Sequence, residues 1–203
     1  HSSHRRQRQM CIRDSHKITH VVDATHPFAA QMSKNAVAAC RQTATQLLAL
    51  TRPPWRRGAG DDWQHACDIA AAVTALSGPE KRVMLAIGRM HLAQFNRSPH
   101  HWYLLRLVDP PDVPPPLPHH HIIISRGPFT VAADAALLQD HDIDLVVAKN
   151  AGGSGAQAKI LAARQLGLPV LMIDRPVLPP RDEVGSVDAV LDWLAHHGTE
   201  RGV

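Results

Sequence analysis

Short apolar segments alternate with longer stretches of helical periodicity along most of the chain. The apolar segments are nearly continuous runs of Val, Ile, Leu and Ala, a pattern typical of strands that are buried on both faces of a parallel sheet. We predict strands at Thr19–Ala24, Gln46–Leu50, Val83–Ile87, Tyr103–Val108, Ile122–Ser125, Leu145–Ala148 and Val170–Ile173. We predict helices at about Phe28–Gln42, Cys67–Leu76, His91–Asn96, Val131–Gln139, Ala156–Leu166 and Val187–His196. Strands that alternate with helices in this way predict an α/β fold.

A turn sequence, Gly78-Pro79-Glu80-Lys81, separates a predicted helix from the next predicted strand. Glycine and proline together mark the ends of elements, so we place a domain boundary here. The chain then divides into a first domain at 18–79 and a second at 80–203. The proline-rich stretch 110–118 is predicted to be a stiff connection inside the second domain.

The net charge of +4 is confined to the N-terminal segment 1–17. This segment carries the basic residues Arg5, Arg6, Arg8, Arg13 and Lys17 against the acidic Asp14. The rest of the chain is neutral overall, which argues against nucleic acid as a partner. Because the segment lacks periodicity, we predict that it is a non-native tail. The chain proper then begins abruptly inside a strand at Ile18, as expected of a truncated N-terminus.

Hydrophobic residues make up 44% of the chain and charged residues 20%, which suits a folded protein with a sizeable core. No run approaches the roughly 18 apolar residues of a membrane span, and no N-terminal stretch has the order of a signal peptide. Cys11, Cys40 and Cys67 lack CxxC spacing, which argues against a disulfide framework or zinc site and fits a reducing cytoplasm. The 15 histidines show no metal-binding spacing, so we interpret them as solvated loop residues and expect no metal.

Polar residues collect where the predicted strands end. In open α/β sheets, ligands bind outside the carboxyl ends of the strands. Most of these ends carry a charged or hydrogen-bonding residue beside Gly or Pro, whereas the amino ends carry simpler turn residues. The candidate binding residues are Thr25, His26, Arg89, Arg126, Lys149, Asn150, Gly152, Gly153, Ser154 and Arg175, with Lys159 in a following helix.

The loop Lys149–Gly155 is the most informative of these strand ends. Its glycines allow the backbone to approach a ligand closely, and Ser154 is predicted to cap the next helix. Backbone N–H groups and the helix dipole would then form an anion site, to which Lys149 and Lys159 add charge. The loop matches neither a Walker A motif nor GxGxxG. The same residues can be explained without a ligand. The loop would then be a helix start whose glycines serve only tight packing, and Lys159 would lie on a solvated face.

The other candidates also have a second explanation. Arg126 and Arg175 offer the planar fork that suits carboxylate or phosphate groups, but surface ion pairs would use it equally well. Thr25 could serve only as a helix cap, and His26 only as a hydrogen-bonded histidine. Asp109 follows a strand and precedes two prolines, where it could transfer a proton or simply form a turn.

Taken together, the loops resemble those of the precorrin-6A reductases of cobalamin biosynthesis. The resemblance rests on Asp23-Ala24-Thr25-His26-Pro27-Phe28-Ala29, Arg106-Leu107-Val108-Asp109-Pro110-Pro111, Arg126-Gly127-Pro128-Phe129 and Lys149-Asn150-Ala151-Gly152-Gly153, followed by Lys159 and Arg175-Pro176. These motifs occur in the family's order over about 18–203. Ala151 is a mild departure from the Ser typical of the family. The family's first strand and its Gly-Gly-Thr loop have no counterpart before Ile18.

The resemblance implies two Rossmann-like domains with parallel sheets, the first incomplete, and NADPH as the cofactor. It implies reduction of one double bond of precorrin-6A, with hydride delivered to one ring carbon and a proton to its neighbour. Asp109 is the expected proton donor by its position in the family motif. The enzyme is expected to be a cytoplasmic monomer without nucleic-acid or membrane partners. Because cofactor contacts are expected in the absent segment, weakened NADPH binding is expected too.

Three alternatives stay open at this point. The cobalt-precorrin-6A reductases of the anaerobic pathway share the fold and the loops and could prefer NADH. A truncated chain could be a non-catalytic fragment that binds a tetrapyrrole or a nucleotide. A phosphate-binding regulator built on Lys149–Gly155 would need neither Asp109 nor Arg126, so the loops taken together argue against it.

Overall fold

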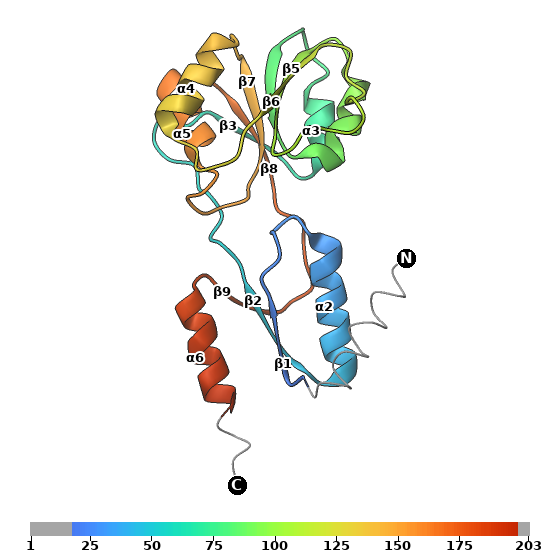
Figure 1. The fold of residues 1–203 in the computed structure, drawn as a ribbon, viewed down its shortest axis with the longest axis vertical. Coiled ribbons are helices and arrows are strands. Elements are labelled where there is room, and N and C mark those ends of the chain that lie inside the picture. The colour runs from blue at the N-terminus through green and yellow to red at the C-terminus, as the bar shows by residue number, and fades with distance from the viewer. Residues whose placement is uncertain (1–17, 199–203) are drawn as a thin grey trace. The chain divides into compact units, whose positions relative to one another are not determined.

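The computed structural model describes residues 18–198, and the chain forms two compact units (Figure 1). The central unit spans Pro54–Arg175, whereas the split unit combines the chain up to Pro53 with the chain from Pro176 onward. The structure thus divides the chain at these points and not at Gly78–Lys81, a turn that lies inside the central unit. Its Gly and Pro do end a helix, but the next strand joins the same sheet as the strand before that helix. The predicted tail at 1–17 lies outside the described residues.

The split unit contains a parallel sheet in the order β1-β2-β9. Its strands are β1 (His20–Asp23), β2 (Gln46–Leu50) and β9 (Asp182–Val184). Helix α2 (Ala30–Thr43) connects β1 to β2, and α6 (Val187–Gly198) follows β9. Because β9 pairs with β2, this sheet needs two segments that are far apart in the sequence.

The central unit contains a six-stranded parallel sheet in the order β3-β8-β7-β4-β5-β6. Its strands are β3 (Trp63–Ala66), β4 (Arg82–Ala86), β5 (Trp102–Leu107), β6 (His120–Ile124), β7 (Leu145–Lys149) and β8 (Val170–Ile173). Its helices are α3 (Ile69–Ala75), the 3₁₀ helix η1 (Arg89–Arg97), α4 (Val131–Asp140) and α5 (Ala158–Leu166). Helix α3 packs against η1 and α4 against α5, and Figure 1 shows α3 and the α4–α5 pair on opposite sides of the sheet.

The strand order of the central sheet reverses between β4 and β7. From β4 the chain adds β5 and β6 on one side, and it then returns to place β7 and β8 on the other side. Open parallel sheets bind ligands at such a reversal, outside the carboxyl ends of the two strands that flank it. The loops that follow β4 and β7 therefore occupy the position expected of a ligand site.

The inner strands of the central sheet form its core. Val83, Met84 and Leu85 of β4 and Val146 and Val147 of β7 are at most 1% exposed. Consecutive residues are buried in this way where helices cover both faces of a sheet. The predicted α/β fold with parallel sheets is therefore confirmed. No helix among residues 18–198 has the length and apolar character needed to cross a membrane.

All the predicted strands are present, but the sequence pattern missed β3 and β9. Strand β3 reads Trp-Gln-His-Ala and β9 reads Asp-Glu-Val, and both lie at the edge of their sheet. These two edge strands keep polar and charged side chains, so they lack the apolar run that identifies an inner strand. The predicted helix His91–Asn96 is found as part of the 3₁₀ helix η1.

Candidate functional site

The loops after β4 and β7 bring basic groups to the carboxyl edge of the central sheet. Gly88, whose φ is +76°, turns the chain from β4 into η1, and the exposed Arg89 follows it. In the first turn of η1, burial lowers the pKa of His91, and the nearby charge of Lys149 lowers it further. Burial also lowers the pKa of Lys149 itself. The reversal point of the sheet therefore holds an imidazole and an amine that are both partly buried.

The loop Lys149–Gly155 has the backbone geometry of an anion site. Gly152 and Gly153 have φ values of +68° and +71°, a region that other residues rarely adopt. Among the described residues, nothing accepts a hydrogen bond from the N–H groups of Gly152, Gly153 and Ser154. Gly152 is buried, and buried N–H groups are nearly always paired. These N–H groups are therefore available to a ligand.

Ser154 does not cap the following helix, contrary to the sequence prediction. Helix α5 begins at Ala158, and Gln157 occupies its N-cap position without a side-chain hydrogen bond. The carbonyl of Ser154 instead accepts from the N–H of Gln157 at 3.3 Å. The chain makes a turn before the helix begins, so the exposed Ser154 side chain stays in the loop.

The carbonyl groups of the same loop are bonded to the protein. Arg175 donates to the carbonyls of Asn150 and Ala151 at 2.9 and 3.1 Å, and the indole of Trp55 donates to the carbonyl of Gly153 at 2.7 Å. The Asn150 side chain accepts from the N–H of Trp55 and donates to its carbonyl, at 2.8 and 3.0 Å. Asn150 and Arg175 were predicted to bind the ligand. The structure shows their side chains bonded to the protein, where they hold the loop.

Lys159 is a buried cation behind the loop. Lys159 is 5% exposed, and its Nζ donates to the carbonyl of Ala156 at 2.5 Å. The Nζ atom also lies 5.2 Å from the centre of the Trp55 ring. Burial, followed by the charge of Arg106, lowers the pKa of Lys159 to about 8. The alternative of a solvated face is thus wrong, and Lys159 contacts the loop from inside the unit; its predicted role in ligand binding stays a prediction.

Asp109 and Arg126 meet at the ends of β5 and β6. The Arg126 guanidinium donates to the Asp109 carboxylate, and the two side chains are 72% and 59% exposed, respectively. Arg126 therefore forms the surface ion pair that was its second explanation. Both residues remain accessible to a ligand at the carboxyl edge of the sheet.

A second ion pair near this edge is buried. Arg106 of β5 donates to Asp134 in the first turn of α4 at 2.5 Å, and both side chains are at most 8% exposed. The Arg106 guanidinium also lies 4.1 Å from the centre of the Phe129 ring. The pair joins the sheet to α4 beside the loop that carries Arg126.

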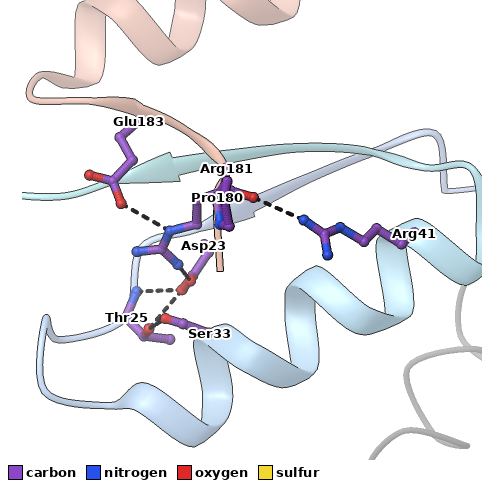
Figure 2. A network of polar contacts seen from close by, with 7 residues as sticks. All are labelled: Asp23, Thr25, Ser33, Arg41, Pro180, Arg181 and Glu183. Atoms are coloured by element: carbon purple, nitrogen blue, oxygen red, sulfur yellow. Dashed lines mark hydrogen bonds and ion pairs between the residues drawn. The ribbon is translucent and has the colours of Figure 1, made fainter. Parts of the chain in front are cut away.

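Asp23 is the centre of a polar network in the split unit (Figure 2). Its carboxylate accepts from the N–H and hydroxyl of Thr25 at 3.1 and 2.7 Å and from Arg181, which also pairs with Glu183 at 3.0 Å. Burial by itself would raise the pKa of Asp23. Hydrogen bonds from Ser33 and Thr25, together with the charge of Arg181, outweigh this effect, and the pKa of Asp23 is lowered overall. A buried carboxylate thus fixes the start of the loop after β1.

Thr25 and His26 lie in this loop, between β1 and α2. Thr25 bonds to Asp23, whereas Ala29 occupies the N-cap position of α2 without a side-chain bond, so Thr25 is not the helix cap. His26 is exposed, and its Nδ1 accepts from the N–H of Phe28 at 3.1 Å. The binding role of Thr25 and His26 stays a prediction.

Sequence reasoning missed Trp55, Arg106 and His91 as parts of these surroundings. Trp55 lies in no predicted element, and its partner Asn150 is 95 residues away. Arg106 is a charged residue inside an otherwise apolar strand, which is itself a signal of a buried partner. His91 was not among the candidates because it lies inside the predicted helix 91–96, although the first turn of η1 presents it at the end of β4.

Fold and loop together define an α/β protein with a glycine-containing loop at the reversal point of a parallel sheet. The family model described as "Precorrin-6x reductase CbiJ/CobK" matches residues 6–195, and the chain belongs to this family. It is an oxidoreductase of cobalamin biosynthesis. The matched range includes part of the segment predicted to be a non-native tail.

Individual relatives agree with this assignment. The chain is 59% identical over 187 residues to the precorrin-6A reductase of Rhodobacter capsulatus, which covers 92% of this chain and 74% of that relative. It is 45% identical over 189 residues to the precorrin-6A reductase of Rhodococcus erythropolis, covering 93% and 75%. The cobalt-precorrin-6A reductase of Methanothermobacter thermautotrophicus is 31% identical over 186 residues, covering 86% and 61%. A solved structure, "CobK precorrin-6A reductase", matches with a TM-score of 0.91 and 56% identity over 96% of this chain and 80% of that one.

Proposed function

We propose that this chain reduces one double bond of precorrin-6A, the metal-free substrate, with NADPH as the hydride donor. The observation that carries this proposal is the loop Lys149–Gly155 at the reversal point of the sheet, where the N–H groups of Gly152, Gly153 and Ser154 have no partner among the described residues and lie in the same loop as a lysine. Similarity supports the metal-free substrate. Relatives named precorrin-6A reductase are 40–59% identical to this chain, and those named cobalt-precorrin-6A reductase are 27–31% identical.

The loop fits the phosphate groups of a dinucleotide. Gly152, Gly153 and Ser154 offer N–H groups that no described residue uses, and Lys149 adds a positive charge beside them. Asn150, Lys159 and Arg175 support the loop from within the protein and do not reach the ligand in this proposal. When bound, NADPH would supply the hydride.

The exposed arginines at the neighbouring strand ends suit the carboxylates of a tetrapyrrole. Arg89 follows β4 and Arg126 follows β6, and both are exposed. A guanidinium binds a carboxylate through two parallel hydrogen bonds, which orients as well as attracts it. Thr25 and His26, in the loop after β1, are proposed to contribute polar contacts to a ligand.

Asp109 is proposed to donate the proton that completes the reduction. In the structure its carboxylate accepts a hydrogen bond from Arg126. A substrate carboxylate that takes over Arg126 would separate this pair and leave the Asp109 side chain free to contact the substrate. Substrate binding and the placement of Asp109 would then be linked through one arginine.

The test is anaerobic turnover of precorrin-6A, with NADPH oxidation and the tetrapyrrole spectrum followed together. Asp109→Asn keeps the size of the side chain and removes the acidic proton, so turnover is expected to fall at least about a hundredfold while tetrapyrrole binding is retained. Asp112→Asn is the matched control, because Asp112 is an exposed carboxylate of the same loop. Full activity of Asp109→Asn would dismiss Asp109 as the acid.

The same assay separates the alternatives. NADH in place of NADPH, and cobalt-precorrin-6A in place of precorrin-6A, are each expected to give lower kcat/KM. A shifted tetrapyrrole spectrum without oxidation of either cofactor would contradict the reductase proposal and favour a non-catalytic binding protein.

A further inference from the structure

The carbonyl and N–H groups of the loop Lys149–Gly155 differ in their hydrogen bonds to the rest of the central unit. The carbonyls of Asn150 and Ala151 accept from Arg175 and that of Gly153 accepts from the Trp55 indole, whereas the N–H groups of Gly152, Gly153 and Ser154 have no partner among residues 18–198. Buried polar groups of a backbone are normally all paired. The unequal pairing therefore indicates that the carbonyl side is structural and the N–H side is kept for a ligand.

Fixing a carbonyl also fixes the direction of the next N–H group. Within one planar trans peptide, the C=O of a residue and the N–H of the following residue point in opposite directions. The bond from Arg175 to the carbonyl of Ala151 thus orients the N–H of Gly152. The bond from Trp55 to the carbonyl of Gly153 orients the N–H of Ser154.

Trp55 is itself held in place, so it can act as a support. It is 7% exposed, and the Asn150 side chain bonds to both its N–H and its carbonyl at 2.8 and 3.0 Å. The charge of Lys159 lies 5.2 Å from the centre of its ring. Such a support matters at the glycines, because a chain with positive φ at two consecutive glycines has many other conformations available.

We propose that Trp55 is a positioning residue for the anion-binding loop: its indole N–H holds the Gly153 carbonyl so that the adjacent N–H groups face an anionic group of a ligand. This inference rests on the proposed function for the identity of the ligand. The anionic group is either a phosphate of NADPH or a carboxylate of the tetrapyrrole, and the experiment separates these sources.

The test compares Trp55→Phe with Trp63→Phe in the full chain. Both tryptophans are buried in the same hydrophobic cluster, at 7% and 6% exposure. Among the described residues, the indole N–H of Trp63 has no partner at full hydrogen-bond geometry and makes only a minor interaction with Asp61, so its replacement by Phe changes the packing and removes at most that contact. Trp63→Phe is therefore the control for loss of aromatic volume.

Amide hydrogen exchange of the loop and ligand affinity are the two measurements. Trp55→Phe is expected to speed exchange in the loop roughly tenfold and to weaken binding of one ligand by a similar factor, whereas Trp63→Phe leaves both unchanged. The dissociation constant of NADPH, from calorimetry, rises if the loop binds phosphate. The KM for precorrin-6A rises instead if it binds a carboxylate. In either case kcat at saturation stays within about twofold, because no group that reacts is removed.

Equal exchange rates in the loops of the two variants would overturn the role of Trp55, whether or not NADPH binds. The same holds if Trp55→Phe and Trp63→Phe weaken binding equally. If the unaltered chain binds no NADPH, the proposed cofactor is wrong, but the exchange comparison still decides the role of Trp55. The two failures are therefore distinguishable.

Discussion

A lysine that is buried with a single carbonyl partner loses most of the hydration of its charge. Lys159 is in this position, and burial lowers its pKa from 10.5 to about 8. Between these values the unfolded chain binds a proton that the folded protein does not. The free energy of unfolding therefore rises with pH over this range as far as Lys159 is concerned.

Replacing Lys159 by Met removes this pH dependence while keeping a side chain of similar length. Between about pH 7 and about pH 9.5, the unfolding free energy of the unaltered protein is expected to rise by about 2 kcal/mol relative to that of the Met variant. Urea unfolding of both proteins at a series of pH values measures it. A difference that stays constant with pH would mean that Lys159 keeps its proton in the folded protein over this range.

The residue scale also shows what the sequence could not predict. Lys149, Asn150, Lys159 and Arg175 have the same donor groups whether they face a ligand or the protein's own carbonyls. Whether they face a ligand or the protein depends on the positions of those carbonyls. These positions depend in turn on contacts such as that of Trp55 with Asn150, which are 95 residues apart. The loop itself was predictable because glycine is the residue that adopts positive φ readily, so its glycines indicate the local backbone conformation without reference to distant contacts.

At the scale of elements, one ion pair crosses the sheet of the split unit. Arg181 lies directly before β9 and Asp23 ends β1, and these strands are separated by β2. The two side chains are 7% and 3% exposed. A buried pair of this kind is costly to break, because removing one partner leaves an uncompensated charge.

Arg181→Met is therefore expected to destabilise the split unit by about 3–5 kcal/mol. Adding Asp23→Asn is expected to recover part of the loss, because it removes the unpaired charge. Glu183→Gln is the control: its side chain is 47% exposed, so a change below about 1 kcal/mol is expected. Unfolding followed by the fluorescence of Trp193 in α6 measures the split unit. Equal losses for Arg181→Met and Glu183→Gln would contradict this account.

The strands that were missed lack the continuous apolar run of the inner strands. Inner strands such as β4 and β7 are apolar at almost every position, so the sequence identifies them. The edge strands β3 and β9 form because a neighbouring strand offers unpaired hydrogen-bonding groups. Their formation therefore depends on the rest of the sheet and cannot be predicted from the few residues of each strand. This is also why the domain division was misplaced, since it depends on where β9 pairs.

At the scale of the whole molecule, the two sheets share no strand. All six strands of the larger sheet, and the helices that connect them, lie within the continuous segment Pro54–Arg175. The smaller sheet, in contrast, needs β9 beside β2, so it needs both parts of the split unit. The physical requirements for independent folding are therefore met by the central unit and not by the N-terminal part of the split unit.

A chain of residues 54–175 is accordingly expected to fold alone, with helical and strand signals in circular dichroism and one cooperative thermal transition. Residues 18–53 are the matched control and are expected to lack such a transition, because β1 and β2 with α2 bury too little apolar surface without β9 and α6. Hydrogen exchange would add a local criterion, since the carbonyl bonds of the loop to Trp55 and Arg175 are formed within 54–175. If 54–175 unfolds without cooperativity, the central unit depends on the split unit for its stability. If 18–53 folds alone, the dependence of the smaller sheet on β9 is wrong.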